Sequence, residues 1–442
     1  MRAWLVLAVI CQAAGLSAGN LERFFLGDDA ALMAGAVAAT ASDPGSIYYN
    51  PAGLARLEHS SVDLGVSAYA ARYYRVPGLA QIVLPDQRRA LDFQGTSFFS
   101  TPAAVAFGFG LRPGLGASFA VFTRDQLDLQ GLFSGTFIGM NGSNPYIFEQ
   151  GVELDFRSKD YLAGGGLGWE PAPGWRLGLS AFGEYQHQSV ATKFWGDYKD
   201  PSSYNPVSQL YGNRLTTSFD QRVAVGDYGL RAVTGLQAEL GHGWSAGLVG
   251  RSPRFTAYQD IGLDMLLDAN VVPGPAVVRV HVNGDGVLHP YVWEEPWRVE
   301  SGLAWTGEHW DLALQGDASD RPDDEGRGAV WNWKLGARYR TGHGWEFGGG
   351  AYSDRRWDEK LVGFAASNID YYGGNLGARW SREIGRGGVE LSTALTLHYE
   401  RGTGEIVGAL VDATLPQFPV PEARTNATFE EANLHLSSGL AW

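Results

Sequence analysis

The sequence contains no long hydrophobic run. A membrane-spanning helix needs roughly 18 consecutive apolar residues, and the only apolar run of note, Trp4 to Ile10, is much shorter. We therefore exclude a helical integral membrane protein. The run follows Arg2 and precedes the small-residue stretch 13–19, an order that is typical of a secretory signal peptide. We expect residues 1–19 to be this signal, with cleavage near Gly19.

Cysteine is almost absent. Cys11 is the only one in 442 residues and lies inside the expected signal, so the mature chain has no disulfide and no cysteine metal ligand. Cys11 would also be the acylation site of a lipoprotein, but the bulky Ile10 before it argues against that alternative. Basic residues are outnumbered 34 to 48 by acidic ones, for a net charge of -14. We expect no nucleic-acid partner.

Motifs for catalysis and metal binding are missing as well. There is no Gly-x-Ser-x-Gly, no His-Glu-x-x-His and no phosphate-binding glycine pattern, and the nine histidines show no metal-ligand spacing. Two possible cation sites are more typical of a solvated loop, at 320–325, and a turn, at 283–286. We expect a protein that is not an enzyme and has no cofactor and no metal.

Glycine and aromatic residues are abundant, with 60 glycines and 12% aromatic residues, and they accompany a two-residue alternation of apolar and polar side chains. The segments 175–181 and 331–339 are clear examples. Alternation of this kind predicts strands with one apolar and one polar face, and it fits either a soluble β-sandwich or a membrane barrel. Within one such strand, the glycines of 164–168 are expected to let the strand bend or another segment approach.

Short and long connections alternate along the chain, which favours the barrel. The six short ones are 112–114, 170–174, 241–243, 306–309, 341–344 and 383–388. The seven longer ones are 72–102, 125–152, 191–217, 255–276, 318–329, 355–370 and 401–430. Thirteen connections predict about fourteen strands, and short periplasmic turns opposite long external loops are typical of outer-membrane barrels.

Aromatic residues support the same interpretation. Tryptophans cluster beside the short turns, as an interfacial girdle would; they are Trp169, Trp175, Trp244, Trp305, Trp310, Trp345 and Trp380. The chain closes on an alternating strand that ends in Trp442, which resembles the signal read by the barrel assembly machinery. The predicted fold is all-β: a transmembrane antiparallel barrel of about 14 strands over 58–442, in the bacterial outer membrane.

Residues 20–57 do not fit the strand pattern. They are rich in small residues, compatible with helix from Asp28 to Ala41, and broken at Asp43-Pro44-Gly45 and again at Asn50-Pro51-Ala52-Gly53. A compact piece ahead of a barrel is most simply a plug. We predict a small, partly helical N-terminal hatch in the lumen.

This segment resembles the hatch of FadL/TodX-type outer-membrane transporters, which are channels for long-chain fatty acids and hydrocarbons. The resemblance is carried by 27–31, 35–40 and 43–55, and most specifically by Asn50 to Ala55. It implies a fourteen-stranded barrel, and passive diffusion of a hydrophobic molecule that leaves sideways through the wall when the hatch shifts. Related hatch motifs also occur in barrels that anchor secretion machinery.

Candidate site residues follow from the hatch and from external segments that are unusually apolar. As a gate we propose Asn50, Pro51, Ala52 and Gly53, with a merely rigid turn as the alternative. As substrate-binding residues we propose Phe133, Phe137, Ile138, Phe148, Leu263, Met265, Leu266 and Leu267, with a self-packed lid as the alternative. Arg338 and Arg379 are candidates to hold a carboxylate headgroup, although such lumen charges more often pair with acids of the protein itself.

The predicted function is passive, hatch-gated transport of long-chain fatty acids or similar hydrophobic compounds across the outer membrane. The alternative is a barrel that anchors or chaperones secreted proteins; a continuous apolar tunnel would favour transport, and a lumen filled by charged side chains would favour the anchor. Expected partners are hydrophobic small molecules, outer-membrane lipid and lipopolysaccharide, and the assembly machinery during biogenesis. We expect a monomer.

Overall fold

The computed structural model describes residues 25–84, 86–206, 208, 210–211, 214–272, 277–285, 296–319, 330–355, 367–384, 389–412 and 420–442. The predicted signal peptide, the first residues of the hatch and the acidic loop at 320–325 lie outside these ranges. None of the described helices is long and apolar enough to cross a membrane.

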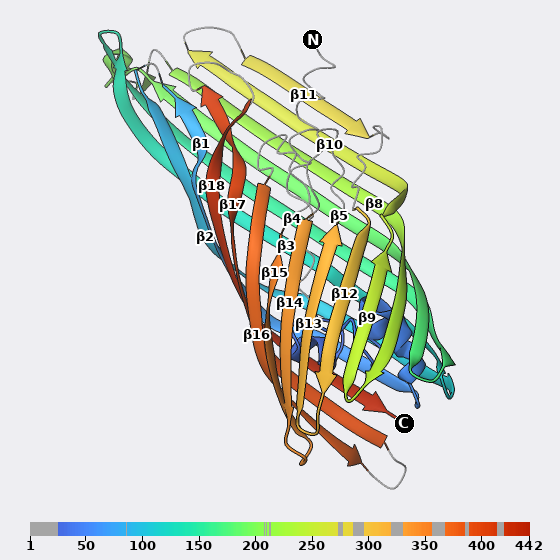
Figure 1. Ribbon diagram of the computed structural model, residues 1–442. Helices are drawn as coiled ribbons and strands as arrows, with labels where there is room; N and C mark the ends of the chain where they lie inside the picture. The colour runs from blue at the N-terminus through green and yellow to red at the C-terminus, as the bar shows by residue number, and fades with distance from the viewer. Residues whose placement is uncertain are drawn as a thin grey trace.

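The described strands close into an antiparallel barrel of fourteen strands, which confirms the predicted fold (Figure 1). Each strand pairs with the next, β18 returns to pair with β1, and β8 pairs with β9. In chain order the barrel strands are β1 Ser61–Val83, β2 Arg88–Arg112, β3 Leu115–Asn141, β4 Asn144–Ala172, β5 Trp175–Lys199, β8 Arg214–Gly241, β9 Trp244–Arg251, β12 Arg298–Thr306, β13 Trp310–Ser319, β14 Val330–Arg340, β15 Trp345–Asp354, β16 Ser367–Ile384, β17 Val389–Asp412 and β18 Val420–Ala441.

Additional elements lie at the two ends of the barrel. β10 Phe255–Val272 and β11 Val277–Asp285 extend the sheet beyond the far half of β8, and β6 Tyr204–Asn205 pairs with β7 Leu210–Tyr211. The hatch consists of α2 Asp28–Leu32, α3 Ser46–Tyr49 and η2 Pro51–Arg56, and a short turn, η3 Pro201–Ser203, follows β5. In Figure 1 the hatch is the blue segment inside the barrel, close to its tight turns.

The predicted long loops are largely wrong. β3 and β4 run through most of 125–152 and meet in a two-residue turn at Gly142 and Ser143, and β1 and β2 likewise fill most of 72–102. Strand pairing satisfies the backbone N–H and C=O groups of these segments, so they form hairpins that continue the barrel wall. One end of the barrel therefore consists of tight turns and the other of long hairpins.

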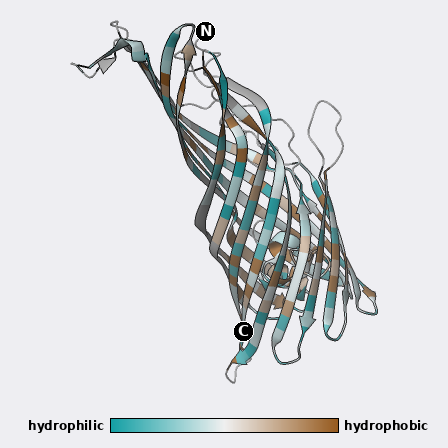
Figure 2. Ribbon diagram, turned by 90° about the vertical axis from the view of Figure 1, so that its left-hand side faces the viewer, coloured by the Kyte–Doolittle hydropathy of each residue, from teal (hydrophilic) through white to brown (hydrophobic). Residues whose placement is uncertain are grey.

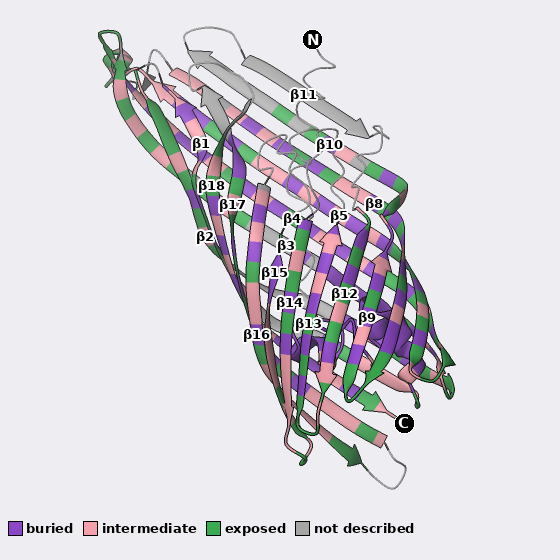
Figure 3. Ribbon diagram, viewed as in Figure 1, coloured by how far each residue is buried: buried purple, intermediate pink, exposed green. Residues whose placement is uncertain are grey.

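The outer face carries an apolar band between two aromatic belts, and Figures 2 and 3 show the alternation of hydropathy and burial along the strands. Near the tight turns, Trp169, Trp175, Trp244, Trp310 and Trp345 are each about half exposed, as predicted for a girdle, whereas Trp305 and Trp380 are more covered.

A second belt, the tyrosine row, crosses four neighbouring strands; it consists of Tyr161, Tyr185, Tyr228 and Tyr258, with ring centroids 4.7–6.3 Å apart. On β5, Trp175 and Tyr185 are ten residues apart, or about 33 Å along the strand. At the usual barrel tilt this is about 25 Å of height, which matches the apolar band of an outer-membrane barrel.

Candidate functional site: the hatch and the seam in the wall

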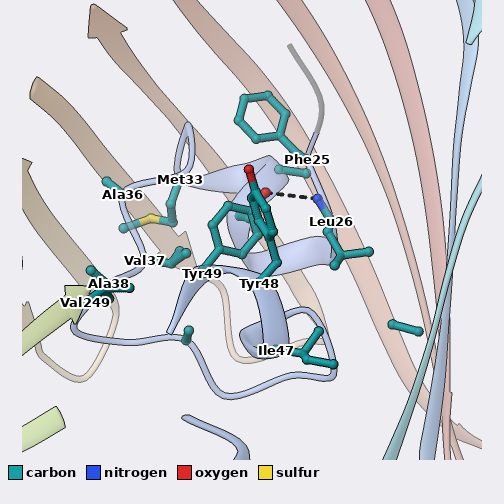
Figure 4. Packing of buried hydrophobic residues seen from close by; sticks show 14 of the residues in the cluster. Phe25, Leu26, Met33, Ala36, Val37, Ala38, Ile47, Tyr48, Tyr49 and Val249 are labelled. Carbon is teal, nitrogen blue, oxygen red and sulfur yellow. Dashed lines mark hydrogen bonds between the residues drawn. The ribbon is translucent and has the colours of Figure 1, made fainter. Parts of the chain in front are cut away.

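The hatch is buried almost completely by the barrel (Figure 3). Its apolar residues are at most 8% exposed, and Leu26, Ile47 and Leu54 at most 1%. Tyr48 and Tyr49 pack edge to face, with ring centroids 5.3 Å apart, and the Tyr49 hydroxyl accepts a hydrogen bond of 3.0 Å from the Leu26 amide (Figure 4). The hatch is thus a packed core within the lumen.

Glycines of the wall let the hatch lie directly against the strands. At each of the following positions, a Cβ atom would come within 2.0–3.1 Å of a hatch atom: Gly108, Gly110, Gly116, Gly166, Gly168, Gly178, Gly235, Gly247, Gly302, Gly336, Gly348 and Gly350. We name these residues the glycine ring. The expectation that glycines of 164–168 let another segment approach is met by Gly166, against Ile47, and Gly168, against Pro51 and Ala55. Any side chain here would displace the hatch.

Asn50, a predicted gate residue, fastens the hatch to the wall. Its amide nitrogen donates hydrogen bonds to the carbonyl of Ala38 (2.6 Å), within the hatch, and to that of Leu236 (3.1 Å), on β8. Its side-chain oxygen accepts from the amide of Ala52 (3.1 Å) and caps η2. Asn50 is 0% exposed, so these bonds are shielded from water.

The other predicted gate residues lie beside Asn50 at the centre of the hatch. Pro51 begins η2, and Ala52 is 0% exposed. A Cβ at Gly53 would lie 2.1 Å from the carbonyl oxygen of Ala41. This arrangement is compatible with either a gate or a rigid turn.

Arg338 and Arg379 are already paired with acids. Both bind Asp29 of the hatch, and Arg379 also binds Glu346 of the wall at 2.6 Å. Arg338 further contacts Asp311 at 2.8 Å. Burial disfavours a charged carboxylate, but the two arginines hold the pKa of Asp29 well below its usual value. A substrate headgroup would have to displace these partners, so the geometry matches the alternative in which lumen charges pair within the protein.

Above the hatch the lumen is crossed by buried ion pairs. The Glu184 carboxylate of β5 forms ion pairs with three arginines: Arg124 of β3 at 3.1 Å, Arg231 of β8 at 2.9 Å and Arg254 at 3.1 Å. A second group joins β9, β12 and β13 through Arg251, Glu300, Arg298 and Asp317. All of these side chains are at most 8% exposed. This level of the lumen is charged rather than apolar.

Beyond the ion pairs, towards the long hairpins, the inner face becomes apolar. Three of the predicted substrate-binding residues meet there: Phe148 and Leu263 belong to one buried cluster, and Phe137 packs against it. Ile138 and Leu266 lie on the opposite face and are 71% and 37% exposed. Phe133, Met265 and Leu267 lie on β3 and β10, and their side chains are outside the described part of the structure.

The wall is interrupted between β2 and β3. Over the described residues their ladder runs only from the Arg112–Leu115 pair to the Val105–Val121 pair. Beyond it, β2 remains paired with β1 and β3 with β4. We name this interruption the seam.

Side chains rather than backbone bonds cover the seam. Phe93 of β2 reaches over Gly131 of β3, whose Cβ would lie 2.1 Å from the Phe93 ring. Tyr74 of β1 stacks on Phe93, with ring centroids 4.8 Å apart, and its hydroxyl donates to the carbonyl of Gln130. Side chains can move without breaking a strand ladder, so the seam can open while the neighbouring strand pairs stay intact.

Sequence reasoning missed Tyr74 and Phe93. Both belong to a second buried apolar cluster with Leu154, Phe156 and Phe429, among others. Both lie within 72–102, which the alternation of short and long connections predicts to be a loop. Extending the two-residue period past Arg72 would have placed Tyr74 on the inner face. Phe93 lies an odd number of residues from the buried Ala104 of the same strand, so the period alone would not have found it.

The likeness to solved structures is one of fold. A Pseudomonas aeruginosa FadL homologue matches with a TM-score of 0.59 at 11% identity, over 96% of this chain and 98% of the other. The Ralstonia pickettii toluene transporter TbuX matches at 0.55 and 14%, over 96% and 99%, and the P. putida toluene transporter TodX at 0.57 and 11%, over 96% and 99%. The chain has the FadL/TodX-type fold. No protein-family model matches the sequence, and neither does any curated protein.

Proposed function

We propose that this FadL/TodX-type barrel carries hydrophobic molecules across the bacterial outer membrane and releases them sideways. In this proposal the long hairpins face outwards and their apolar inner face captures the solute. The hatch closes the direct route to the periplasm, and the solute leaves through the seam between β2 and β3.

The seam is the observation that carries this proposal. An apolar solute moving straight down would meet the buried ion pairs around Glu184 and then the hatch, which is packed against the glycine ring. The seam instead lies on the apolar side of that barrier: it begins beside the Thr123–Tyr161 pair, at the outer edge of the apolar band, and continues outwards beneath Phe93 and Tyr74. Leaving towards hydrocarbon favours the solute by about 0.8 kcal/mol per buried CH₂ group.

The substrate class is long-chain fatty acids or similar hydrophobic compounds, including aromatic hydrocarbons. The aromatic side chains at the seam are suited to either, and two of the similar structures are described as toluene transporters. We place gating at Asn50, because it joins the hatch to β8 through one side chain. A shift of the hatch would break that bond and loosen the barrier.

A second candidate function is supported by the charged part of the lumen. A barrel that anchors or chaperones secreted proteins needs no apolar path, and the ion pairs at Glu184 and Glu300 block one at mid-height. The long hairpins would then be the docking surface. The two functions differ in whether a small solute crosses.

Uptake of labelled oleate and labelled toluene by a Gram-negative host lacking its own importers tests the proposal. The strains carry this chain, an Asn50→Ala/Pro51→Ala variant or empty vector, and heat-modifiable migration confirms that each barrel has inserted. We expect uptake above vector for at least one solute and an altered rate in the variant. Uptake equal to vector from an inserted barrel would reject transport of both solutes and favour the anchor.

A further inference from the structure

A hollow of about 670 Å³ lies on the outer face of the barrel, across β4, β5, β8 and β10. We propose that it binds the phosphate-bearing headgroup of a glycolipid of the outer leaflet. The inference relies on the proposed function only for the orientation of the barrel in the outer membrane. It needs no transported solute.

Small side chains form the floor of the hollow. One cross-strand row reads Arg157, Ser189, Ala224 and Gly262, in register from β4 to β10. These residues lie on the face opposite the buried Phe156, Val223 and Leu263. Three consecutive small residues on a sheet otherwise covered by long side chains leave a depression, and a Cβ at Gly262 would meet nothing within 4 Å.

Three cations surround this floor. Arg157 is 54% exposed and lies 2.9 Å from Asp155. Arg222 is 74% exposed, lies 4.0 Å from Asp220 and is paired in register with Asp264. Lys193 is exposed and lies in register between Glu153 and Asp220, so the lining holds four acids beside its three cations. Charged hydrogen bonds from arginine and lysine are the usual way to hold a phosphate ester.

The hollow also lies at the height of a lipid headgroup. On β5, Ser189 is four residues beyond Tyr185 of the tyrosine row, or about 13 Å along the strand. Tyrosines of such belts mark the membrane–water interface. A phosphate attached to a sugar at the top of a lipid would therefore reach the hollow while its acyl chains remain beside the apolar band.

Other strands show the same order of aromatic and basic residues. On the outer face, Arg75 lies two residues beyond Tyr73, and Arg401 two residues beyond Tyr399; all four are exposed. Arg355 lies 5.9 Å from the ring centre of Tyr372. Exposed cations thus accompany the aromatic belt around the barrel, although the net charge of the chain is -14. A divalent cation can bind carboxylate and phosphate oxygens at the same time, so the acids beside these cations can also help to hold the phosphate.

A binding experiment with purified bisphosphorylated lipid A, in mixed micelles with Mg²⁺, tests the proposal. Native mass spectrometry counts the lipid A molecules bound to each barrel. The full-length mature barrel is compared with Arg157→Gln/Lys193→Gln/Arg222→Gln, which removes the cations. Ala224→Leu/Gly262→Leu fills the floor without changing a charge. The matched control is Arg112→Gln/Arg382→Gln, because both arginines are exposed at the tight-turn end.

We expect both hollow variants to weaken binding by about tenfold and the control to match the parent. Removing the phosphates from lipid A should weaken its binding to the parent barrel. The loss should equal the loss caused by the hollow variants with intact lipid A. Equal binding by parent and hollow variants, or by phosphorylated and dephosphorylated lipid, would overturn the proposal. Displacement of lipid A by millimolar inorganic phosphate would assign the site to a soluble phosphate instead of a lipid. Heat-modifiable migration verifies folding, and failed solute uptake would leave this result unaffected.

Discussion

At the scale of single residues, the absence of side chains is as important as their presence. The glycine ring permits hatch and wall to touch through backbone atoms, so each of its members is sensitive to the smallest possible substitution. Gly178 on β5 is a clear case, because its Cβ would lie 2.1 Å from the backbone carbon of Pro51.

Gly178→Ala should loosen the hatch and destabilise its docking by about 1–3 kcal/mol, the usual effect of overpacking. Ionic conductance in planar bilayers should rise, because the plug no longer fits. Gly183→Ala on the same strand is the control, since its Cβ has only one neighbour, at 3.8 Å. Equal conductance for the two variants would contradict the role given to the glycine ring.

Asp43 should make docking of the hatch dependent on pH. Burial, together with the nearby carboxylates of Asp29 and Asp28, raises the pKa of Asp43 from the ordinary 3.8 to about 7. Between about pH 4 and pH 7 the docked hatch thus keeps a proton that an undocked hatch releases, and docking weakens as pH rises through this window.

Asp43→Asn should remove that pH dependence and stabilise docking at pH 8 by up to about 4 kcal/mol. Its side-chain oxygen can still accept the 3.1 Å bond from the Ser46 amide. Hydrogen exchange of residues 25–57 at pH 5 and pH 8 measures the effect. The exchange rates are corrected for the intrinsic effect of pH on amide exchange. If the parent hatch then exchanges equally fast at pH 5 and pH 8, the role given to Asp43 is refuted.

At the scale of elements, sequence patterns predicted the strands well where short turns delimit them. The predicted loops are wrong between β1 and β2 and between β3 and β4, because the strands continue there and keep their alternation, as at Tyr74. The hatch was found from its broken helical pattern. Its partners could not be found, since contacts such as Asp29 with Arg379 join residues 350 positions apart.

Asp29 acts as a latch between the hatch and the β14–β16 side of the wall. Asp29→Asn should remove the acid that Arg338 and Arg379 share and leave them only their wall partners, Asp311 and Glu346. The cost in docking should be at most about 3–5 kcal/mol, the usual cost of breaking a buried pair. Limited proteolysis within 25–57 should accelerate at neutral pH. Glu308→Gln serves as the control because Glu308 is 91% exposed. Unchanged proteolysis in Asp29→Asn would show that the latch is not needed.

At the scale of the whole molecule, the barrel separates two tasks. Ion pairs and the hatch seal its lower lumen, whereas apolar clusters line the upper part and reach the wall at the seam. The central claim is that hydrophobic solutes cross by this seam. It predicts that fixing β2 to β3 stops uptake even when hatch and lumen are untouched.

The most direct measurement is uptake of labelled oleate and toluene by cells carrying Phe93→Cys/Gly131→Cys, before and after bridging with a short cleavable bis-maleimide. The mature chain has no other cysteine if the signal is removed as expected. Phe107→Cys/Phe119→Cys, a pair already joined within the β2–β3 ladder, is the control. We expect that bridging the seam abolishes uptake and that cleaving the bridge restores it. In the control variant, bridging should leave uptake unchanged. Undiminished uptake through a bridged seam would contradict lateral release.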